Sequence, residues 1–427
     1  MSGDELSQHK WKQMTLGEVA TICHGFSFKS ENFVSNGKMP VIRIGNIKNW
    51  RVIIDDSVFV EDENRLEPYL LRRGDFVIAL TGGDVSNLET ATGRVGLYQE
   101  KFPSVLNQRL ARIDVDESRA DKQFIYFMLA NKAAVYSLAS IANGSAQKNL
   151  TTKHVLNFSI ALPSLSEQKS IAAVLASLDD KIELLRAQNK TLEEMVQRLF
   201  REWFVDFNFP DNDGKPYKTS GGKIVESEYG ETPEGWQTKS YTDLVNVLSG
   251  GTPKTDVPEY WNGQIPFFTP KDAKDTFYVD TTEKYITEAG LSACNSKLYP
   301  KDTVFITARG TVGKCALALR DMAMNQSCYA LVGKYISNLF VFLLTKQLIE
   351  VIKKSASGAV FDAITVSTFH SLNVVLGDRE VTDRFEALIR PMFNKIANNT
   401  EEIFKLTELR DQLLPKLMSA EIQMQKG

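Results

Sequence analysis

The sequence predicts a mixed α/β protein built from two repeated globular domains, each followed by a long helix, with the two helices paired as an antiparallel coiled coil. Three observations support this. One long stretch follows a heptad pattern, a second stretch repeats it at a constant offset, and the segments preceding both share one order of features. The predicted segments are a first domain at 1–163, a helix at 164–206, a linker or loose surface hairpin at 207–235, a second domain at 236–377 and a helix at 378–427.

The first heptad stretch shows alternating spacings of three and four residues between large apolar side chains, which is typical of a coiled-coil helix. Ser164, three residues before Glu167 and directly after a proline, fits a capping box that would begin this helix. One seam position is filled by Ile171, Leu178, Leu185, Leu192 and Leu199, and the other by Leu175, Ile182, Asn189, Val196 and Trp203.

The second heptad stretch follows the first at an offset of 214 residues, and its seam contains Asn399 as a polar member. When two helices pair antiparallel, the residue numbers of the two residues at each facing position add up to the same value. Placing Asn189 opposite Asn399 sets this sum at 588, which then matches apolar residues along nearly the whole seam and leaves Arg410 as the one mismatch. A buried asparagine pair fixes register at some cost in stability. Pro391 and Pro415 are expected to kink or break the second helix near its ends.

The two globular segments share an order of landmarks. Trp236 corresponds to Trp11, and the pair Asn325-Gln326 corresponds to Asn107-Gln108. A β-rich run, a buried strand and a helical run occur in the same order in both, whereas the polar loops differ. The sequence therefore predicts an internal duplication with a shared scaffold.

Composition restricts the classes of function. The chain has 427 residues and a formal net charge of −3, so a DNA-binding surface would have to be a local patch or be completed by a partner. No 18-residue apolar run and no secretory signal are found, and the four scattered cysteines fit reduced thiols, so we expect a cytoplasmic protein without a membrane span.

Catalytic motifs are missing from the sequence. It lacks the Asn-Pro-Pro-aromatic tetrapeptide of amino-methyltransferases, a phosphate-binding Gly-Lys-Ser/Thr loop and an HExxH metal motif. His154 and His370, near the two equivalent closing strands, fit structural roles better than metal binding. We therefore expect no catalytic residue, no metal and no cofactor bound by this chain.

Polar loops with basic and amide side chains are the remaining candidate sites. Arg, Asn and Gln read base edges, whereas Lys, Ser and Thr more often position phosphates. Gln147 and Asn149 suit adenine, Arg309 suits guanine, and Lys148, Lys153 and Lys314 suit phosphates, although each residue taken singly also fits a solvated surface position. The candidate DNA-binding set is Lys29, Arg43, Asn46, Gln147, Lys148, Asn149, Lys153, Lys254, Lys271, Thr307, Arg309, Thr311 and Lys314.

Three stretches resemble the specificity subunits of type I restriction–modification systems. Their central conserved region is similar to the stretch LPSLSEQKSIAAVLASLDDKIELLRAQNKTLEEMVQRLFREWFVDF. Their C-terminal conserved region is similar to ITVSTFHSLNVVLG and LLPKLMSAEI, and the start of their second target-recognition domain is similar to EYGETPEGW. The second conserved region departs from the family pattern, because it lacks the Glu-Gln-Lys element at its start.

The resemblance implies two target-recognition domains, each reading one half of a split, asymmetric site in double-stranded DNA. The helices would act as a spacer and dock two modification subunits, which carry S-adenosylmethionine and methylate adenine. Restriction subunits would be a further partner in a complete complex.

Two other classes of function stay open on the residues alone. A coiled-coil scaffold without DNA binding would show no DNA retardation even with its partner subunits. A stand-alone DNA-modifying enzyme would methylate or cleave DNA as the isolated chain.

Overall fold

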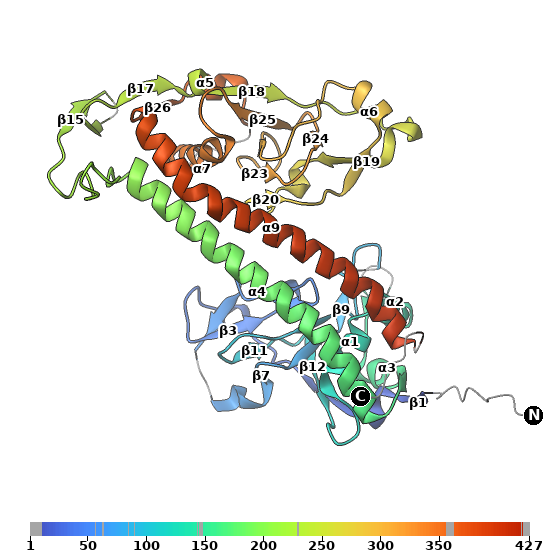
Figure 1. Cartoon of the computed structure of the whole chain (residues 1–427). Coiled ribbons are helices and arrows are strands. Elements are labelled where there is room, and N and C mark those ends of the chain that lie inside the picture. The colour runs from blue at the N-terminus through green and yellow to red at the C-terminus, as the bar shows by residue number, and fades with distance from the viewer. Residues whose placement is uncertain are drawn as a thin grey trace, which may run out of the picture. The chain divides into compact units, whose positions relative to one another are not determined.

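The computed structural model describes residues 11–55, 57–61, 64–83, 85–88, 90–142, 144, 148–228, 230–355, 363–419 and 421. Its contacts divide the chain into two compact units. Unit 1 comprises residues 1–180 and 407–427, and unit 2 comprises residues 181–406. Each unit contains one of the predicted globular domains and parts of two long helices (Figure 1).

The two long helices are α4 (Leu165–Phe204) and α9 (Arg379–Met418), each of 40 residues. The predicted cap of α4 is present in part, because the Ser164 hydroxyl accepts a hydrogen bond from the Glu167 N–H at 3.3 Å. Helix α9 continues through Pro391 and Pro415, so of the kink or break predicted at these prolines the break is wrong.

The helix persists at Pro391 because packing outweighs the one backbone hydrogen bond that a proline removes. Ile389 and Phe393, on either side of this proline, are completely buried in the core of unit 2. Their burial holds the flanking turns in helical geometry. Tertiary contacts therefore override the local preference for a helix end.

Within unit 2 the helices pair antiparallel in the predicted register. Asn399 Nδ2 donates to Asn189 Oδ1 at 2.9 Å, and the rings of Trp203 and Phe385 lie 5.3 Å apart. Asn189 Nδ2 in turn donates to the Thr400 hydroxyl at 3.2 Å. The asparagine pair that sets the sum of 588 is therefore a hydrogen-bonded contact in the seam.

Replacing Asn399 with leucine is expected to lower the free energy of unfolding by about 1–3 kcal/mol, because Asn189 Oδ1 loses its donor in the seam. The double variant Asn189→Leu, Asn399→Leu removes both polar partners and should be more stable than the single variant. Urea denaturation of the two variants checks this. Equal stability of the single variant and the wild type would mean that the contact contributes nothing.

Unit 1 contains a six-stranded sheet, a four-stranded sheet and two small two-stranded sheets among its described residues. The six-stranded sheet has, in order, β2 (Ala20–His24), β12 (Leu110–Val115), β8 (Phe76–Ala79), β10 (Val95–Leu97), β5 (Arg51–Val52) and β4 (Ile47–Lys48). The four-stranded sheet has β6 (Val58–Val60), β3 (Met39–Ile42), β11 (Ser104–Leu106) and β7 (Leu70–Leu71). The two-stranded sheets pair β1 (Lys12–Thr15) with β14 (Ser159–Leu162), and β9 (Thr81–Gly82) with β13 (Lys148–Asn149).

The predicted helical run of unit 1 forms two helices, α1 (Lys122–Leu129) and α2 (Lys132–Ser140), followed later by α3 (Thr152–Leu156). The division falls at Asn131, whose side chain accepts a hydrogen bond from the Ala133 N–H at 2.8 Å and caps α2.

Unit 2 contains a five-stranded and a three-stranded sheet among its described residues. The larger has, in order, β18 (Val245–Ser249), β25 (Cys328–Gly333), β22 (Val304–Thr307), β23 (Cys315–Ala318) and β20 (Tyr278–Val279). The smaller has β21 (Lys284–Ile286), β19 (Trp261–Phe268) and β24 (Ala323–Met324). Two further pairs are β15 (Ile224–Ser227) with β16 (Gly230–Pro233), and β17 (Gln237–Ser240) with β26 (Asn373–Leu376). The helices are α5 (Tyr241–Leu244), α6 (Glu288–Ser292), α7 (Asn338–Ser355) and α8 (Val366–His370).

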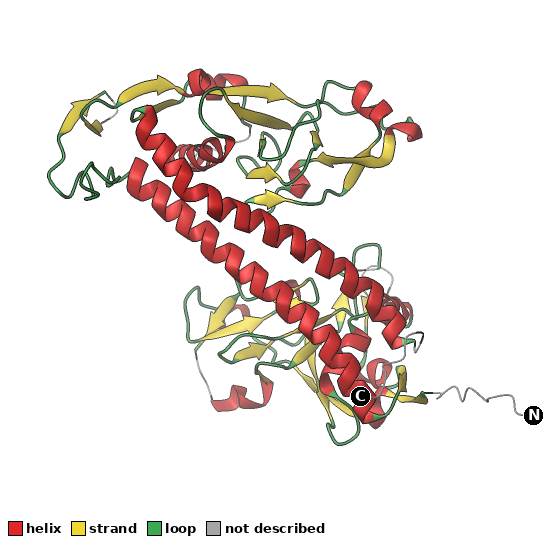
Figure 2. Ribbon diagram, in the orientation of Figure 1, coloured by secondary structure: helices red, strands yellow, loops and turns green. Residues whose placement is uncertain are grey.

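Several strand pairings of unit 1 recur in unit 2, and each unit contains sheets with flanking helices (Figure 2). The antiparallel series β2-β12-β8-β10 corresponds to β18-β25-β22-β23. The parallel pair β3 with β11 corresponds to β19 with β24, and the parallel pair β5 with β10 corresponds to β20 with β23. The predicted duplication is therefore a duplication of topology as well as of sequence.

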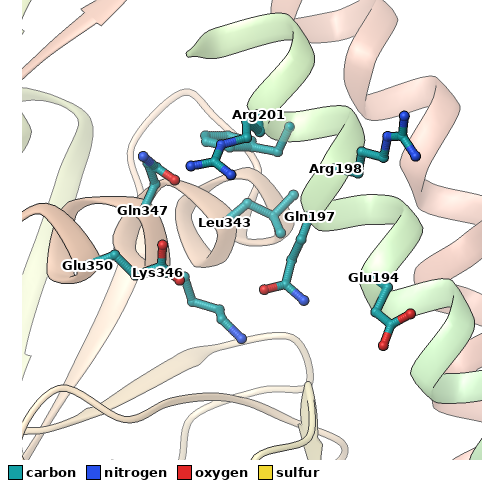
Figure 3. A pocket seen from close by; sticks show the side chains of 9 residues that line it. Glu194, Gln197, Arg198, Arg201, Leu343, Lys346, Gln347 and Glu350 are labelled. Atoms are coloured by element: carbon teal, nitrogen blue, oxygen red, sulfur yellow. The ribbon is translucent and has the colours of Figure 1, made fainter. Parts of the chain in front are cut away.

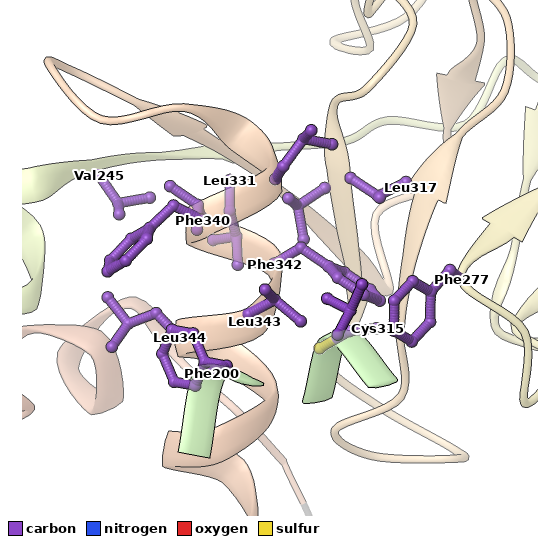
Figure 4. Packing of buried hydrophobic residues seen from close by; sticks show 14 of the residues in the cluster. Phe200, Val245, Phe277, Cys315, Leu317, Leu331, Phe340, Phe342, Leu343 and Leu344 are labelled. Carbon is purple, nitrogen blue, oxygen red and sulfur yellow. The ribbon is translucent and has the colours of Figure 1, made fainter. Parts of the chain in front are cut away.

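The core of unit 2 joins α7 to the sheet and to α4. Phe340, Phe342 and Leu343 of α7 pack in one cluster with Phe200 of α4 and with Phe277 (Figure 4). Aromatic side chains of this size account for much of the apolar area that is removed from water. The C-terminal half of α4 is therefore part of the domain core.

The segment 207–235, predicted as a linker or a loose surface hairpin, is anchored to unit 2. It contains the β15–β16 hairpin. Phe209 is buried and stacks on Tyr217 and Trp236, with ring centroids 4.7 and 5.2 Å away. This small aromatic cluster was not predicted from the sequence, because most residues of the segment are polar.

Candidate nucleic-acid interface

An open cleft of about 540 Å³ lies in unit 1, between the turn that follows β3 and the turn that leads into β12. Arg43 and Arg109 bring two guanidinium groups to this cleft. Within the described part of the chain, neither guanidinium makes a hydrogen bond or an ion pair. The residues that line the cleft are Arg43, Ile44, Gly45, Asn46, Asn107 and Arg109.

Asn46, a predicted DNA contact, is buried and holds the turn that carries Arg43. Its Oδ1 accepts a hydrogen bond from the Arg43 N–H at 2.8 Å. Its Nδ2 donates to the Ile53 carbonyl oxygen at 2.8 Å and to the Ser57 hydroxyl at 3.2 Å. The Asn46 amide therefore orients the backbone of the cleft, and Arg43 is the more accessible of the two residues.

The strand β13 carries two further predicted contacts, Lys148 and Asn149. Lys148 Nζ donates to the Ala139 carbonyl oxygen at 3.2 Å, which ties this side chain to the end of α2. Asn149 is exposed. Gln147, the predicted adenine reader next to them, lies outside the described residues.

Two other predicted lysines of unit 1 are exposed. Lys153 lies on α3, and Lys29 forms a 3.7 Å ion pair with Glu31 in which both side chains are more than 70% exposed. Such an exposed pair contributes little to stability, so the Lys29 ammonium can exchange its carboxylate for another anion at low cost.

In unit 2, residues 307–314 form a tight turn between β22 and β23. Thr307 is completely buried, and its hydroxyl donates to the Thr311 carbonyl oxygen and accepts from the Lys314 N–H. Gly310 and Gly313 adopt positive φ angles of 81° and 80° that close the turn. Thr307 is therefore a structural residue of the turn.

The exposed tip of this turn carries Arg309. No hydrogen bond or ion pair of its guanidinium is found among the described residues. Thr311 is fixed to the neighbouring loop, because its hydroxyl donates to the Pro270 carbonyl oxygen at 3.2 Å. Arg309 is thus a free cation on a rigid support.

The predicted lysines of unit 2 differ in their surroundings. Lys271 pairs with Glu283 at 3.4 Å, and Lys314 pairs with Asp275 at 3.2 Å. The side chain of Lys254 is exposed, while its carbonyl oxygen accepts a hydrogen bond from the Trp261 indole at 3.1 Å. Lys271 and Lys314 are therefore ion-paired within unit 2.

The loops of the two units share one backbone arrangement. The Arg43 N–H donates to Asn46 Oδ1 at 2.8 Å in unit 1, and the Thr269 N–H donates to Asp272 Oδ2 at 2.8 Å in unit 2. The turn leading into the next strand matches as well. The Leu80 N–H donates to the Arg109 carbonyl oxygen at 3.0 Å, and the Ala308 N–H donates to that of Ser327 at 2.8 Å.

Arg109 was missed by the sequence-based prediction, although a signal for it exists. It directly follows the pair Asn107-Gln108, whose counterpart Asn325-Gln326 is followed by Ser327. The two domains therefore share the Asn-Gln pair but differ in the next residue, which is arginine in one and serine in the other. Such a difference indicates a position where the backbone is the same and the surface side chain is not.

The histidines within the described residues, His24, His154 and His370, have hydrogen-bond partners. His24 Nε2 lies 2.6 Å from the Thr152 hydroxyl, and His370 Nδ1 lies 3.2 Å from that of Thr242. His154 Nδ1 accepts a hydrogen bond from the Thr151 N–H at 3.4 Å at the start of α3. Among the described residues no group of His, Cys, Asp and Glu is placed to hold a metal ion, and no helix is long and apolar enough to cross a membrane.

A second surface feature is a groove of about 330 Å³ between α4 and α7 in unit 2 (Figure 3). Its walls carry both signs of charge, and the lining residues are Glu194, Gln197, Arg198, Phe200, Arg201, Leu343, Lys346, Gln347 and Glu350. Beside it, burial raises the pKa of the Glu193 carboxyl above its ordinary value, and a 2.9 Å hydrogen bond from the Phe277 N–H partly offsets this. The groove is therefore a mixed-charge surface on a rigid pair of helices.

The chain matches a known family over most of its length. The family model for the type I restriction modification DNA specificity domain matches residues 8–194 and 233–383. The MjaIX specificity subunit of Methanocaldococcus jannaschii is 27% identical over 333 residues, which cover 76% of this chain and 74% of that protein. The HindI specificity subunit of Haemophilus influenzae is 22% identical over 468 residues, covering 96% and 99%.

A solved structure shares the fold. The type I restriction–modification S subunit from M. genitalium superposes with a TM-score of 0.57 at 16% sequence identity and covers 99% of each chain. The family match over both domains, together with this fold, decides the family. The chain belongs to the type I restriction–modification DNA specificity family and is the DNA specificity subunit of a type I restriction–modification complex.

Proposed function

We propose that each globular domain reads one half of a bipartite, asymmetric site in double-stranded DNA. The observation that carries this proposal is the shared backbone of the two domains with different side chains upon it. Arg43 and Arg109 occupy positions that correspond to Thr269 and Ser327 in the other unit. Two copies of one scaffold with different reading groups suit two different half-sites.

The two long helices act as the spacer between the half-sites. A helix of 40 residues at 1.5 Å per residue is about 60 Å long, which exceeds the ~34 Å between major-groove segments one DNA turn apart. The asparagine pair supports this role, because a spacer needs a fixed register.

Two modification subunits dock on the helices and carry out the chemistry. They hold S-adenosylmethionine and methylate adenine, and restriction subunits complete the complex that cleaves DNA. The mixed-charge groove between α4 and α7 supports a docking role, since rigid helices with charges of both signs favour a specific orientation of a partner. The near-neutral chain also fits a complex in which the modification subunits clamp the duplex.

The test of this function is the methylation pattern of a genome that carries the assembled complex. Sequencing of methylated adenines should give two different short sequences separated by a gap of fixed length. A continuous palindromic site, or methylation by this chain alone, would contradict the proposal. Absence of DNA retardation by the assembled complex would support the alternative of a scaffold without DNA binding.

Replacing Arg309 with alanine is expected to relax one base position in the half-site read by unit 2, at a cost of about 1–3 kcal/mol in binding. The free guanidinium at the tip of the turn can donate two hydrogen bonds to the O6 and N7 atoms of guanine. The measurement is the affinity of the assembled complex for its site and for duplexes substituted at each position. The matched control is Arg309→Lys, which keeps the positive charge and loses the planar guanidinium that donates two parallel hydrogen bonds.

Unchanged affinity and unchanged specificity in the alanine variant would remove Arg309 from the interface. An equal loss on every sequence would assign it to a phosphate. For Gln147 the predicted adenine contact stays a prediction, with Gln147→Ala as its test.

A further inference from the structure

The cleft of unit 1 differs in chemistry from the corresponding place in unit 2, although the backbone is the same. Hydrogen bonds of the backbone hold the turns at Arg43 and Arg109. Equivalent hydrogen bonds hold the turns at Thr269 and Ser327 in unit 2. A shared neighbour supports this equivalence. A Cβ atom added at Gly25 would lie 2.2 Å from the Asn107 carbonyl oxygen, and one at Gly250 would lie 2.2 Å from that of Asn325. Hence two arginines replace two hydroxyl side chains at fixed positions.

Both arginines are available to a ligand. Arg109 is exposed, Arg43 is half-buried, and neither guanidinium is hydrogen-bonded or ion-paired within the described residues. Gly45, which lines the cleft in the turn after Arg43, has open space around it, since an added Cβ would meet no atom within 4 Å. A planar group can therefore approach the backbone closely at this point.

The support of the cleft is rigid. Asn46 is only 3% exposed and fixes the Arg43 turn through three hydrogen bonds. The Asn107 N–H donates to the Ile42 carbonyl oxygen at 3.0 Å and holds the second turn against β3. Reading a base requires donors that start from fixed positions, and this arrangement fixes the two backbone turns that carry the arginines before a ligand arrives.

The difference between corresponding residues of the two domains favours a base over a phosphate as the ligand of this cleft. Both domains meet the same sugar–phosphate backbone, so phosphate contacts at equivalent positions gain nothing by differing between them. Base contacts have to differ when the half-sites differ. The replacement of Arg43 and Arg109 by Thr269 and Ser327 on one scaffold is the pattern expected of base readers.

We propose that Arg43 and Arg109 are specificity-determining residues of unit 1 that bind the O6 and N7 acceptors of guanine in its half-site. Arginine is suited to this edge because its planar fork donates two parallel hydrogen bonds. Unit 2 lacks arginine at these positions and presents Arg309 instead, one residue after Ala308, which corresponds to Leu80 of unit 1. The guanine contact in the second half-site is therefore displaced relative to the first. This inference rests on the proposed function of the two domains.

The experiment uses the complex assembled with its modification subunits and the duplex defined by wild-type methylation sequencing. Affinities are measured for that duplex and for duplexes in which each guanine is replaced in turn. The variants of the full-length chain are Arg109→Lys, Arg43→Lys and the double variant Arg43→Thr, Arg109→Ser, which installs the residues of unit 2. We expect the double variant to lose about 10- to 100-fold in preference for guanine in one half-site and to leave the other half-site unchanged.

The lysine variants separate base from phosphate contacts. Lysine keeps a phosphate contact as a point charge, so a phosphate role predicts wild-type specificity and a wild-type salt dependence. A base role predicts loss of guanine preference with an unchanged salt dependence. Arg309→Lys is the matched control, because it should affect the other half-site only.

The inference is overturned if the half-site of unit 1 contains no guanine, if the lysine variants keep full specificity, or if all sequences lose affinity equally. In each of these cases the complex still methylates a bipartite site, so the proposed function survives. If the wild-type complex recognises no bipartite site, the proposed function itself fails. Thermal unfolding of each variant shows whether the domain is intact.

Discussion

Replacing Arg410 with leucine is expected to lower the free energy of unfolding by about 3–5 kcal/mol, although leucine completes the apolar seam of the second helix. Arg410 Nη1 lies 2.8 Å from Asp179 Oδ1, and the two side chains are only 15% and 9% exposed. Removal of the guanidinium leaves the Asp179 carboxylate buried without its cation. The penalty for that uncompensated charge exceeds the gain from one more apolar contact.

The double variant Asp179→Leu, Arg410→Leu removes both charges and should recover most of the loss, because apolar replacement of a whole buried pair is often neutral. Arg186→Leu is the matched control. Arg186 pairs with Glu183 at 2.7 Å on the surface of α4, with 44% and 35% exposed side chains, so its loss should cost under ~1 kcal/mol. Urea denaturation gives all three values. If Arg410→Leu and Arg186→Leu were equally mild, the pair would not be a buried one in solution.

Insertion of one heptad into both long helices is expected to lengthen the gap between the half-sites by about three base pairs. The insertions follow Asp180 in α4 and precede Thr407 in α9, where the two compact units divide. Seven residues add about 10 Å to a helix, and a whole heptad keeps the facing residues on both sides in register. Methylation sequencing of the assembled complex measures the gap and the half-site bases together.

The control is the same heptad inserted into α4 alone, which should misalign the Asn189–Asn399 contact and abolish site recognition. Altered half-site bases in the doubly extended chain would contradict the separation of spacer and recognition surfaces. The end of α4 near 204–210 is less suitable as an insertion point. Phe204 and Phe209 are buried there in the core of unit 2, so an insertion would also disturb the domain.

The long helices were predictable because their signal is local and repeated. Heptad spacing depends only on the helical period, and the constant offset of 214 residues tied one helix to the other. The facing asparagines followed from the same arithmetic, and their hydrogen bond at 2.9 Å agrees with it. Local rules failed at Pro391, where burial of the flanking Ile389 and Phe393 keeps the helix continuous.

The candidate site was less predictable, because composition does not distinguish a reading side chain from a supporting one. Asn46 and Thr307 have the polarity of DNA contacts, yet both are buried and hold turns. Arg109 joins Arg43 in one cleft across more than sixty positions of sequence. Such a pairing depends on strand order, and one sequence contains no direct measure of it.

By itself the sequence determined the duplication and the helical pair with its register, since these rest on periodicity and on ordered landmarks, and it indicated the family through the resemblance of three stretches to known specificity subunits. The tertiary structure alone decided which polar side chains remain free. It placed the Arg410 charge against Asp179 and the Asn46 amide inside a turn, and it left the guanidinium groups of Arg43, Arg109 and Arg309 without partners among the described residues. The physical reason is that a polar group's role depends on which donors and acceptors the fold brings within hydrogen-bond distance, and burial makes each of those partners obligatory.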